Sequence, residues 1–202
     1  MATVADRIVD AALELLHKEG LDRLSTRRLA KELNIQGPSL YHHFRNKAEL
    51  LGYMAASMVQ RTVLRLDQNV PWDRWLWTLA HATRDMVLEC RDGARLLASS
   101  YPNEDMQHQL VPGIAQPLIK AGFTPRIANE CTLFVASYVI GWTTNEQNER
   151  LRGLMGTVLE IPAAFSHGVE VLVRGISDLY GNPLSTDFPV WNDLPAASPA
   201  HN

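Results

Sequence analysis

The segment of residues 24–47 constrains the fold more than any other part of this 202-residue chain. It contains two short amphipathic stretches with a tight break between them. Ser25 suits the N-cap of the first helix because its hydroxyl can accept a hydrogen bond from a free backbone N–H, and Leu29 then lies on the apolar face. Asn34 ends this helix, and Ile35 is expected to be buried in the turn. We therefore predict a helix-turn-helix in this segment.

The second helix of the segment begins near Gly37 and Pro38, since glycine is tolerated at a cap and proline suits the first helical position. Leu40 and Phe44 are four residues apart, so they share a face and are expected to pack inward. The polar side chains between them then point away from the core, where they can hydrogen-bond base edges or phosphates. The exposed tip is predicted to consist of Gln36, Gly37, Ser39, Tyr41 and His42.

Positive charge is concentrated in the same segment. Residues 23–47 contain six lysines and arginines and a single acid, Glu32, whereas the whole chain has a net charge of −3. A basic patch on an acidic chain is the electrostatic signature of phosphate binding. The segment is therefore predicted to bind double-stranded DNA. An ordinary pair of solvated helices with one charged face is the alternative that charge and periodicity leave open.

The first quarter of the chain, residues 5–55, resembles the N-terminal DNA-binding domain of the TetR family of transcriptional repressors. The motifs that carry the resemblance are Thr26-Arg27, Leu29-Ala30, Pro38-Ser39-Leu40-Tyr41, His43-Phe44 and Asn46-Lys47.

The resemblance implies which side chains contact DNA. The positions that touch bases in family members are occupied here by Arg27, Pro38, Ser39, Tyr41 and His42. The positions of phosphate contacts are occupied by Thr26, His43 and Lys47. Gly37 stands where tetracycline repressors carry a base-reading glutamine, so we expect a different operator, with Gln36 taking part of that role.

The rest of the chain shows helical periodicity, without an alternating strand pattern or an internal repeat. We expect helices over residues 4–19, 46–67, 72–91 and 93–102, a helix that begins at Pro125, and a last one from Pro162 to about Gly181. The predicted fold class is all-α. A three-helix helix-turn-helix domain at residues 1–47 precedes a larger helical regulatory and dimerisation domain at residues 48–181. A proline-rich tail at residues 182–202 is expected to be extended or flexible.

Residues 131–142 are apolar on every side of their helix, so we expect one side to face the chain's own core and the other a second subunit. The C-terminal half resembles the regulatory domain of tetracycline repressors at residues 90–97, 121–123 and 166–176. That resemblance implies a homodimer through a four-helix bundle, which presents two reading heads to a palindromic operator. Val139 and Val173 are the positions at which an introduced charge is expected to break the dimer.

The same resemblance implies a small-molecule pocket whose ligand releases the DNA. The histidines that chelate magnesium–tetracycline would fall near Val63 and Leu97, and an asparagine near Leu79, and all three positions are apolar here. We therefore expect a largely apolar effector rather than magnesium–tetracycline. Trp72, Trp75 and Trp77 are too closely spaced on one helix for all three to face inward.

Plain core packing is the alternative role for each aromatic residue or methionine of the expected pocket. The predicted pocket residues are Leu79, Thr83, Met86, Leu97, Tyr101, Ile114, Tyr138 and Trp142, with His81, Gln109 and Asn145 as hydrogen-bonding partners.

The sequence shows no nucleophile elbow, phosphate loop, zinc signature or paired-carboxylate motif, so no catalytic residue, metal or cofactor is predicted. No apolar run approaches the length of a membrane span, and the first residues lack a secretory apolar region. Cys90 and Cys131 are expected to be buried thiols of a cytoplasmic protein. We predict a ligand-responsive transcriptional regulator, most simply a repressor. A ligand-independent DNA-binding dimer and an enzyme on the same fold are the alternatives.

Overall fold

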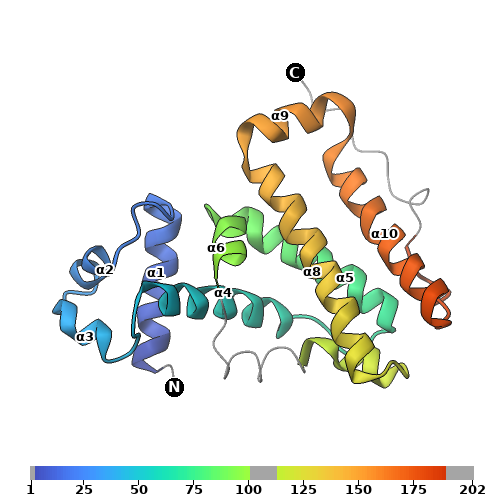
Figure 1. Cartoon of the computed structure of the whole chain (residues 1–202), viewed down its shortest axis with the longest axis horizontal. Helices are drawn as coiled ribbons and strands as arrows, with labels where there is room; N and C mark the ends of the chain where they lie inside the picture. The colour runs from blue at the N-terminus through green and yellow to red at the C-terminus, as the bar shows by residue number, and fades with distance from the viewer. Residues whose placement is uncertain (1–2, 101–112, 190–202) are drawn as a thin grey trace. The chain divides into compact units, whose positions relative to one another are not determined.

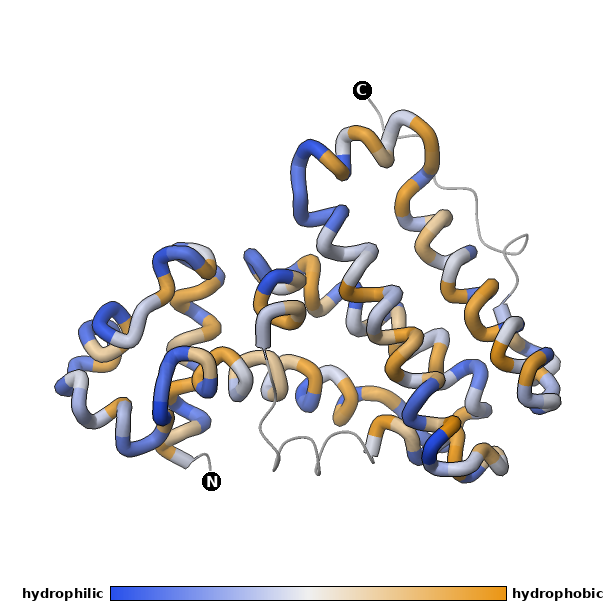
Figure 2. Tube along the Cα trace, in the orientation of Figure 1, coloured by the Kyte–Doolittle hydropathy of each residue, from blue (hydrophilic) through white to orange (hydrophobic). Residues whose placement is uncertain are grey.

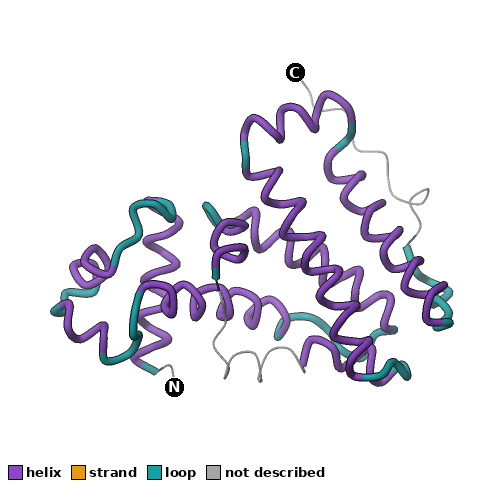
Figure 3. Tube along the Cα trace, viewed as in Figure 1, coloured by secondary structure: helices purple, strands orange, loops and turns teal. Residues whose placement is uncertain are grey.

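The computed structural model describes residues 3–100 and 113–189, and within these ranges the chain is helical and contains no strand (Figures 1 and 3). This confirms the all-α prediction. Residues 113–120 are also helical. The helices are α1 (Val4–Glu19), α2 (Thr26–Glu32), α3 (Gly37–Tyr41), α4 (Lys47–Val63), α5 (Trp72–Glu89), α6 (Gly93–Ser99), α8 (Pro125–Gln147), α9 (Glu149–Val158) and α10 (Ile161–Tyr180).

The chain forms two compact units. The first unit runs to Arg65 and includes residues 85–113, and the second comprises residues 66–84 and 114–202. Helix α5 therefore contributes to both. The predicted boundary at residue 47 separates a DNA-binding domain from a regulatory domain. It is a functional boundary, and it stays a prediction.

The first unit has a continuous apolar core formed by α1, α2, α3, α4 and α6. Ile8, Leu16, Leu29 and Met54 are among its fully buried members. α1 begins in a capping box, in which Thr3 and Asp6 exchange backbone and side-chain hydrogen bonds. Such caps satisfy the backbone N–H groups that a helix start leaves free.

The helix-turn-helix closes as its sequence predicts. The Ser25 hydroxyl accepts a hydrogen bond from a backbone N–H of the first turn of α2, and Leu40 and Phe44 are buried. Asn34 takes the left-handed conformation with φ 53°, which ends the helix sharply. The expected burial of Ile35 was wrong, because its side chain is 38% exposed. The turn places this residue at the edge of a surface hollow rather than in the core.

Helix α4 starts within one residue of the predicted position, and the Asn46 side chain caps it by accepting a hydrogen bond from the Glu49 N–H. It ends at Val63, a turn earlier than predicted. Helix α9 was not predicted. Asn148 caps it with hydrogen bonds from the N–H groups of Arg150 and Leu151, and α9 has no buried residue. Because α9 buries no residue, its sequence lacks the strong apolar face by which a helix is predicted from a single chain.

The second unit is built around α5, α8 and α10, and Figure 2 shows apolar positions distributed along all three helices. Val139 and Val173 are fully buried within the unit. Neither side chain is therefore exposed to a second subunit, and a charge at either position would disrupt this core first. The large apolar residues of α8 that remain exposed are Leu133 and Phe134, at 64% and 51%. α8 is thus buried on one side only within the chain.

The segment after α10 packs against the second unit. Buried Asp73 on α5 accepts hydrogen bonds from the backbone N–H and the hydroxyl of Ser185, at 2.6 and 2.8 Å. Phe188 is buried against Trp77, with ring centroids 5.8 Å apart. The expected flexibility of the tail therefore does not hold for residues 182–189, because this acceptor and this aromatic contact hold them. Residues 190–202 lie outside the described residues.

The three tryptophans of α5 divide as their spacing predicts. Trp72 and Trp75 are buried, and Trp77 is half-buried. The indole N–H of Trp75 donates to the carbonyl of Ile114 at 2.9 Å, and that of Trp72 donates to the carbonyl of Pro183 at 3.3 Å. Both buried indoles thus find a hydrogen-bond partner.

Candidate nucleic-acid interface and effector site

The predicted reading tip forms one exposed surface on α3 and the turn before it. Gln36, Pro38, Ser39, Tyr41 and His42 are exposed, and Gly37 is half-buried. Gln36 is the N-cap residue of α3, so the helix begins one residue earlier than the sequence suggested. Leu40 holds this surface in place from behind, because it is buried in the core of the first unit. The side chains that could read DNA therefore stand on a supported helix.

A hydrogen bond links the start of α2 to α3. The Thr26 and Tyr41 hydroxyls lie 3.3 Å apart. The resemblance assigned Thr26 to a phosphate and Tyr41 to a base, and the fold brings the two hydroxyls together. Two neighbouring hydroxyls can donate hydrogen bonds to, and accept them from, the same strand of DNA.

The cations of the segment are not equivalent in the folded chain. Arg28 forms a fork with Glu19, in which Nε donates to Oε1 at 3.0 Å, and this pair lowers the pKa of Glu19 through the hydrogen bond to Arg28. Lys18 contacts Glu32 at 3.6 Å.

None of the ion pairs among residues 3–100 and 113–189 involves Arg27 or Lys47. Exposed cations without an acidic partner are the ones best placed to meet phosphates. Arg27, His43 and Lys47 are exposed, and Thr26 is half-buried.

The second unit contains an aromatic cluster between α5, α8 and α10. The Tyr138 and Phe165 rings are stacked with centroids 5.4 Å apart, and Trp142 meets the same Phe165 at 6.0 Å. His81 lies edge-on to Phe165 at 5.2 Å, and its Nε2 is 2.9 Å from the Ser166 hydroxyl. Phe165 is thus the centre of the cluster.

Polar groups in this cluster are almost completely satisfied. The Tyr138 hydroxyl donates to the Phe165 carbonyl at 3.0 Å, and burial raises the pKa of Tyr138 to about 12. Trp142 is the exception: its Nε1 is buried and has no hydrogen-bond partner among the described residues. A buried N–H without an acceptor is costly, so it marks a place where a bound molecule could supply one.

A buried ion pair closes one side of the cluster. Arg84 donates from Nε and from a terminal nitrogen to the two carboxylate oxygens of Glu146, at 3.0 and 2.9 Å. The guanidinium also lies over the Phe165 ring, 5.0 Å from its centroid. Because the charges of Arg84 and Glu146 compensate each other, this side of the cluster has little net charge.

The predicted pocket residues do not all gather here. Leu79, His81, Thr83, Ile114, Tyr138, Trp142 and Asn145 belong to the second unit, and Asn145 is exposed. Met86 and Leu97 belong to the first unit, where they pack against its apolar core. Tyr101 and Gln109 lie outside the described residues. Sequence reasoning missed Arg84, Glu146 and Ser166. An acid that follows the apolar run of residues 131–142 in α8 was the signal that could have indicated Glu146.

Two of the three apolar positions that stand where tetracycline-chelating residues are expected are buried. Val63 and Leu79 are buried, and Leu97 is half-buried. Within residues 3–100 and 113–189 no group of three or more His, Cys, Asp or Glu side chains is arranged to hold a metal ion. None of the helices described is long and apolar enough to cross a bilayer.

Cys90 and Cys131 are not joined in a disulfide. Cys131 is buried and Cys90 half-buried. Burial raises the pKa of Cys131 to about 11, and it also raises the pKa of Cys90. Cys90 lies one residue beyond the end of α5 rather than within a helix.

Comparison with protein families gives two matches along the chain. Residues 8–54 match the model for bacterial regulatory proteins of the tetR family, and residues 67–160 match the tetracyclin repressor-like C-terminal domain. The first match spans α1 to α4 up to Met54 and includes the whole helix-turn-helix.

Curated and solved relatives agree with these matches. The class D tetracycline repressor protein of Escherichia coli is 31% identical over 194 residues, which cover 84% of this chain and 87% of the relative. The crystal structure of a TetR variant from Acinetobacter baumannii AYE with minocycline has a TM-score of 0.72 and 33% identity, covering 89% of this chain and 98% of that one. BioQ with its natural double-stranded DNA operator has a TM-score of 0.68 and 29% identity, covering 87% and 99%.

Proposed function

The chain belongs to the TetR family of bacterial regulatory proteins, and on this premise we propose that it is a ligand-responsive transcriptional repressor. The observation that carries the proposal is the exposed surface of α3, where Ser39, Tyr41 and His42 stand clear of the core that Leu40 anchors. We assign DNA contacts to Thr26, Arg27, Gln36, Gly37, Pro38, Ser39, Tyr41, His42, His43 and Lys47. BioQ, a relative of similar fold, has been solved with a DNA operator, which supports this use of the surface.

The repressor is proposed to act as a homodimer through the exposed sides of α8 and α10. Leu133 and Phe134 on α8, and Val171 and Leu179 on α10, are large apolar side chains left exposed within the chain. Apolar side chains gathered on adjoining helices usually mark an interface. Gly141 and Gly175 are exposed on the same two helices, and such small residues would allow close approach of a second copy. A two-fold dimer binds a palindromic operator because each half-site meets one head.

The effector is proposed to be a small, largely apolar aromatic molecule that carries one neutral hydrogen-bond acceptor. The aromatic cluster around Phe165 offers ring faces, and the Trp142 N–H offers a donor without a partner among the described residues. A carboxylate is not favoured, because the charge of Arg84 is already compensated by Glu146. The effector must bind the state that does not bind DNA more tightly, by about 1–3 kcal/mol or more.

The protein is further proposed to act in the cytoplasm and to have no enzymatic role. Its relatives are transcriptional regulators, and a regulator of this kind must reach the chromosome.

The test is operator binding by fluorescence anisotropy, using a palindrome selected from DNA that flanks the gene. Tyr41→Ala should weaken binding by about 5–150-fold, the equivalent of ~1–3 kcal/mol for a lost base contact. The circular dichroism spectrum and the thermal unfolding midpoint should not change, because Tyr41 is exposed. Arg152→Ala on α9 is the control and should bind as the parent does. Unchanged affinity of Tyr41→Ala would remove α3 from the interface.

A further inference from the structure

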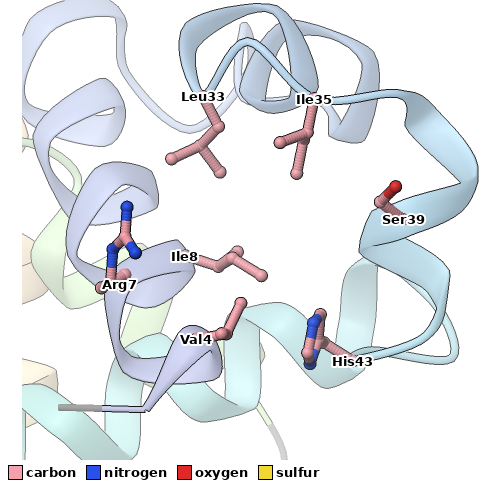
Figure 4. A pocket seen from close by; sticks show the side chains of 7 residues that line it. All are labelled: Val4, Arg7, Ile8, Leu33, Ile35, Ser39 and His43. Atoms are coloured by element: carbon pink, nitrogen blue, oxygen red, sulfur yellow. The ribbon is translucent and has the colours of Figure 1, made fainter. Parts of the chain in front are cut away.

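A hollow lies in the first unit between the start of α1, the turn after α2, and α3. Its volume is about 210 Å³. Figure 4 shows the side chains that surround it; those of Val4, Ile8, Leu33 and Ile35 point toward a common space, and Arg7, Ser39 and His43 stand at its border. The lining residues are Val4, Arg7, Ile8, Leu33, Ile35, Ser39 and His43.

The hollow exists because the turn does not bury its apolar residue. Ile35 is 38% exposed and Leu33 is half-buried, so their side chains line the hollow rather than fill the core. On α1, Val4, Arg7 and Ile8 share a face by their spacing. On the opposite side the hollow meets Ser39 on α3 and His43, which lies two residues beyond the end of α3. The apolar floor of the hollow consists of Val4, Ile8, Leu33 and Ile35. Its polar rim consists of Arg7, Ser39 and His43.

The electrostatic character of the rim is positive. Arg7 is exposed and forms no ion pair among the described residues, and no acid lines the hollow. The acids of α1 nearest in sequence are engaged elsewhere. The Asp6 carboxylate accepts a hydrogen bond from the Thr3 N–H at 2.8 Å, and Asp10 pairs with Arg61. The hollow also lies at the N-terminal end of the 16-residue α1, where the helix dipole favours an anion.

An occupant of this hollow must offer an anion to the rim and an apolar surface to the floor. Ser39 and His43 are also among the residues that the proposed function places on DNA. One backbone unit of DNA meets all of these conditions, since its phosphate would face Arg7, the Ser39 hydroxyl and His43. Its deoxyribose carbons would face Ile8 and Ile35.

We propose that the hollow receives one phosphate–deoxyribose unit of the operator, and that Arg7 is a phosphate contact additional to the helix-turn-helix set. This inference rests on the proposed function. It adds a contact from α1, which lies outside the segment whose charge and motifs predicted DNA binding. A guanidinium suits the role because it presents several donors in a fixed fork.

The experiment measures operator affinity at a series of KCl concentrations for the full-length parent, Arg7→Ala, Arg7→Lys and Arg152→Ala. Arg7→Ala should bind roughly tenfold more weakly at low salt, and its slope of log K against log [KCl] should be shallower by about one unit. Arg7→Lys should keep most of the slope, and Arg152→Ala should match the parent. Since Arg7 is exposed, the thermal unfolding midpoint of each variant should stay that of the parent.

A second arm locates the phosphate. Operators that carry a single neutral methylphosphonate are scanned along each half-site against the parent and Arg7→Ala. At the phosphate that meets Arg7, the two changes should not add, because they remove the same interaction. Ile35→Ser should weaken binding without altering the salt slope, since it affects only the apolar floor.

Three outcomes separate the possibilities. A parent that binds no operator overturns the proposed function itself. A parent that binds, with Arg7→Ala equal to Arg152→Ala in affinity and slope, overturns the Arg7 contact alone. Additive effects of Arg7→Ala at every methylphosphonate position also overturn it, since Arg7 would then act only through its general charge.

Discussion

The pair of Arg84 and Glu146 permits a sharp test of the energetics of the second unit. Their side chains are 14% and 5% exposed, and they join α5 to α8 across 62 residues of sequence by two hydrogen bonds. Replacement of Arg84 by methionine keeps much of the apolar stem over Phe165 but leaves the Glu146 carboxylate buried without this cation. Breaking one side of a buried pair costs about 3–5 kcal/mol, because the remaining charge is not solvated.

The magnitude can be checked against two matched variants. Arg126 and Glu130 form an exposed pair within α8, at 85% and 39%, so Arg126→Ala should cost no more than about 0.5 kcal/mol. The double variant Arg84→Met/Glu146→Leu removes both charges and should lie within about 2 kcal/mol of the parent. The double variant loses the cation–π contact between Arg84 and Phe165, which lowers its free energy of unfolding. This loss is offset because two charges no longer have to be desolvated on folding.

The assay is urea unfolding followed by circular dichroism. All variants are measured at one fixed chain concentration, because association of subunits adds to apparent stability. The free energy of unfolding is obtained from the midpoint and the slope m. An Arg84→Met variant as mild as Arg126→Ala would refute the reasoning. A double variant as unstable as the single one would refute it too, since the cost would then come from lost packing rather than from an isolated charge.

Three further predictions test local features. Ser25→Ala should lower the free energy of unfolding by about 1 kcal/mol through loss of the N-cap, and Ser25→Asn should restore it; equal loss in both would contradict the cap. Burial raises the folded-state pKa of Tyr138 to about 12, above the unfolded value of ~10, so its contribution to stability is complete below pH ~10 and is lost as the pH rises through 12. An alkaline titration of phenolate absorbance should show one late tyrosine that Tyr138→Phe lacks, and an unchanged curve would count against it. Leu133→Glu should yield a folded monomer by light scattering, whereas Val139→Glu should unfold the chain; a dimeric Leu133→Glu would move the interface away from α8.

Local signals along the sequence predicted the starts of several elements correctly. Ser25, Asn46 and Thr124 each cap the helix that follows, because a cap depends on a side chain and a backbone N–H only two or three residues away. The inward face of α3 was equally predictable, since four-residue spacing places Leu40 and Phe44 together on any helical turn. The exposed face of α3, to which we assign DNA contacts, follows from the same short-range rules.

Other features depend on contacts between residues far apart in the chain. The charge count of residues 23–47 included Arg28, but the fold pairs it with Glu19 from α1. The buried position of Val139 and the exposed one of Leu133 could not be separated while residues 131–142 were apolar on every side. The hydrogen bond from Ser185 to Asp73 joins residues 112 positions apart, so no local pattern could predict that the segment after α10 packs against α5.

The sequence by itself determined the helical class, the caps at Ser25, Asn46 and Thr124, and the exposed face of α3, because each arises within one or two turns of helix. Tertiary structure alone decided which charges are neutralised, which apolar residues face a core and where a hollow opens. Those properties depend on which distant segments meet, and the periodicity of one segment carries no information about its partner. The seven residues around the hollow illustrate this, since α1, the turn and α3 form it only once they are folded together.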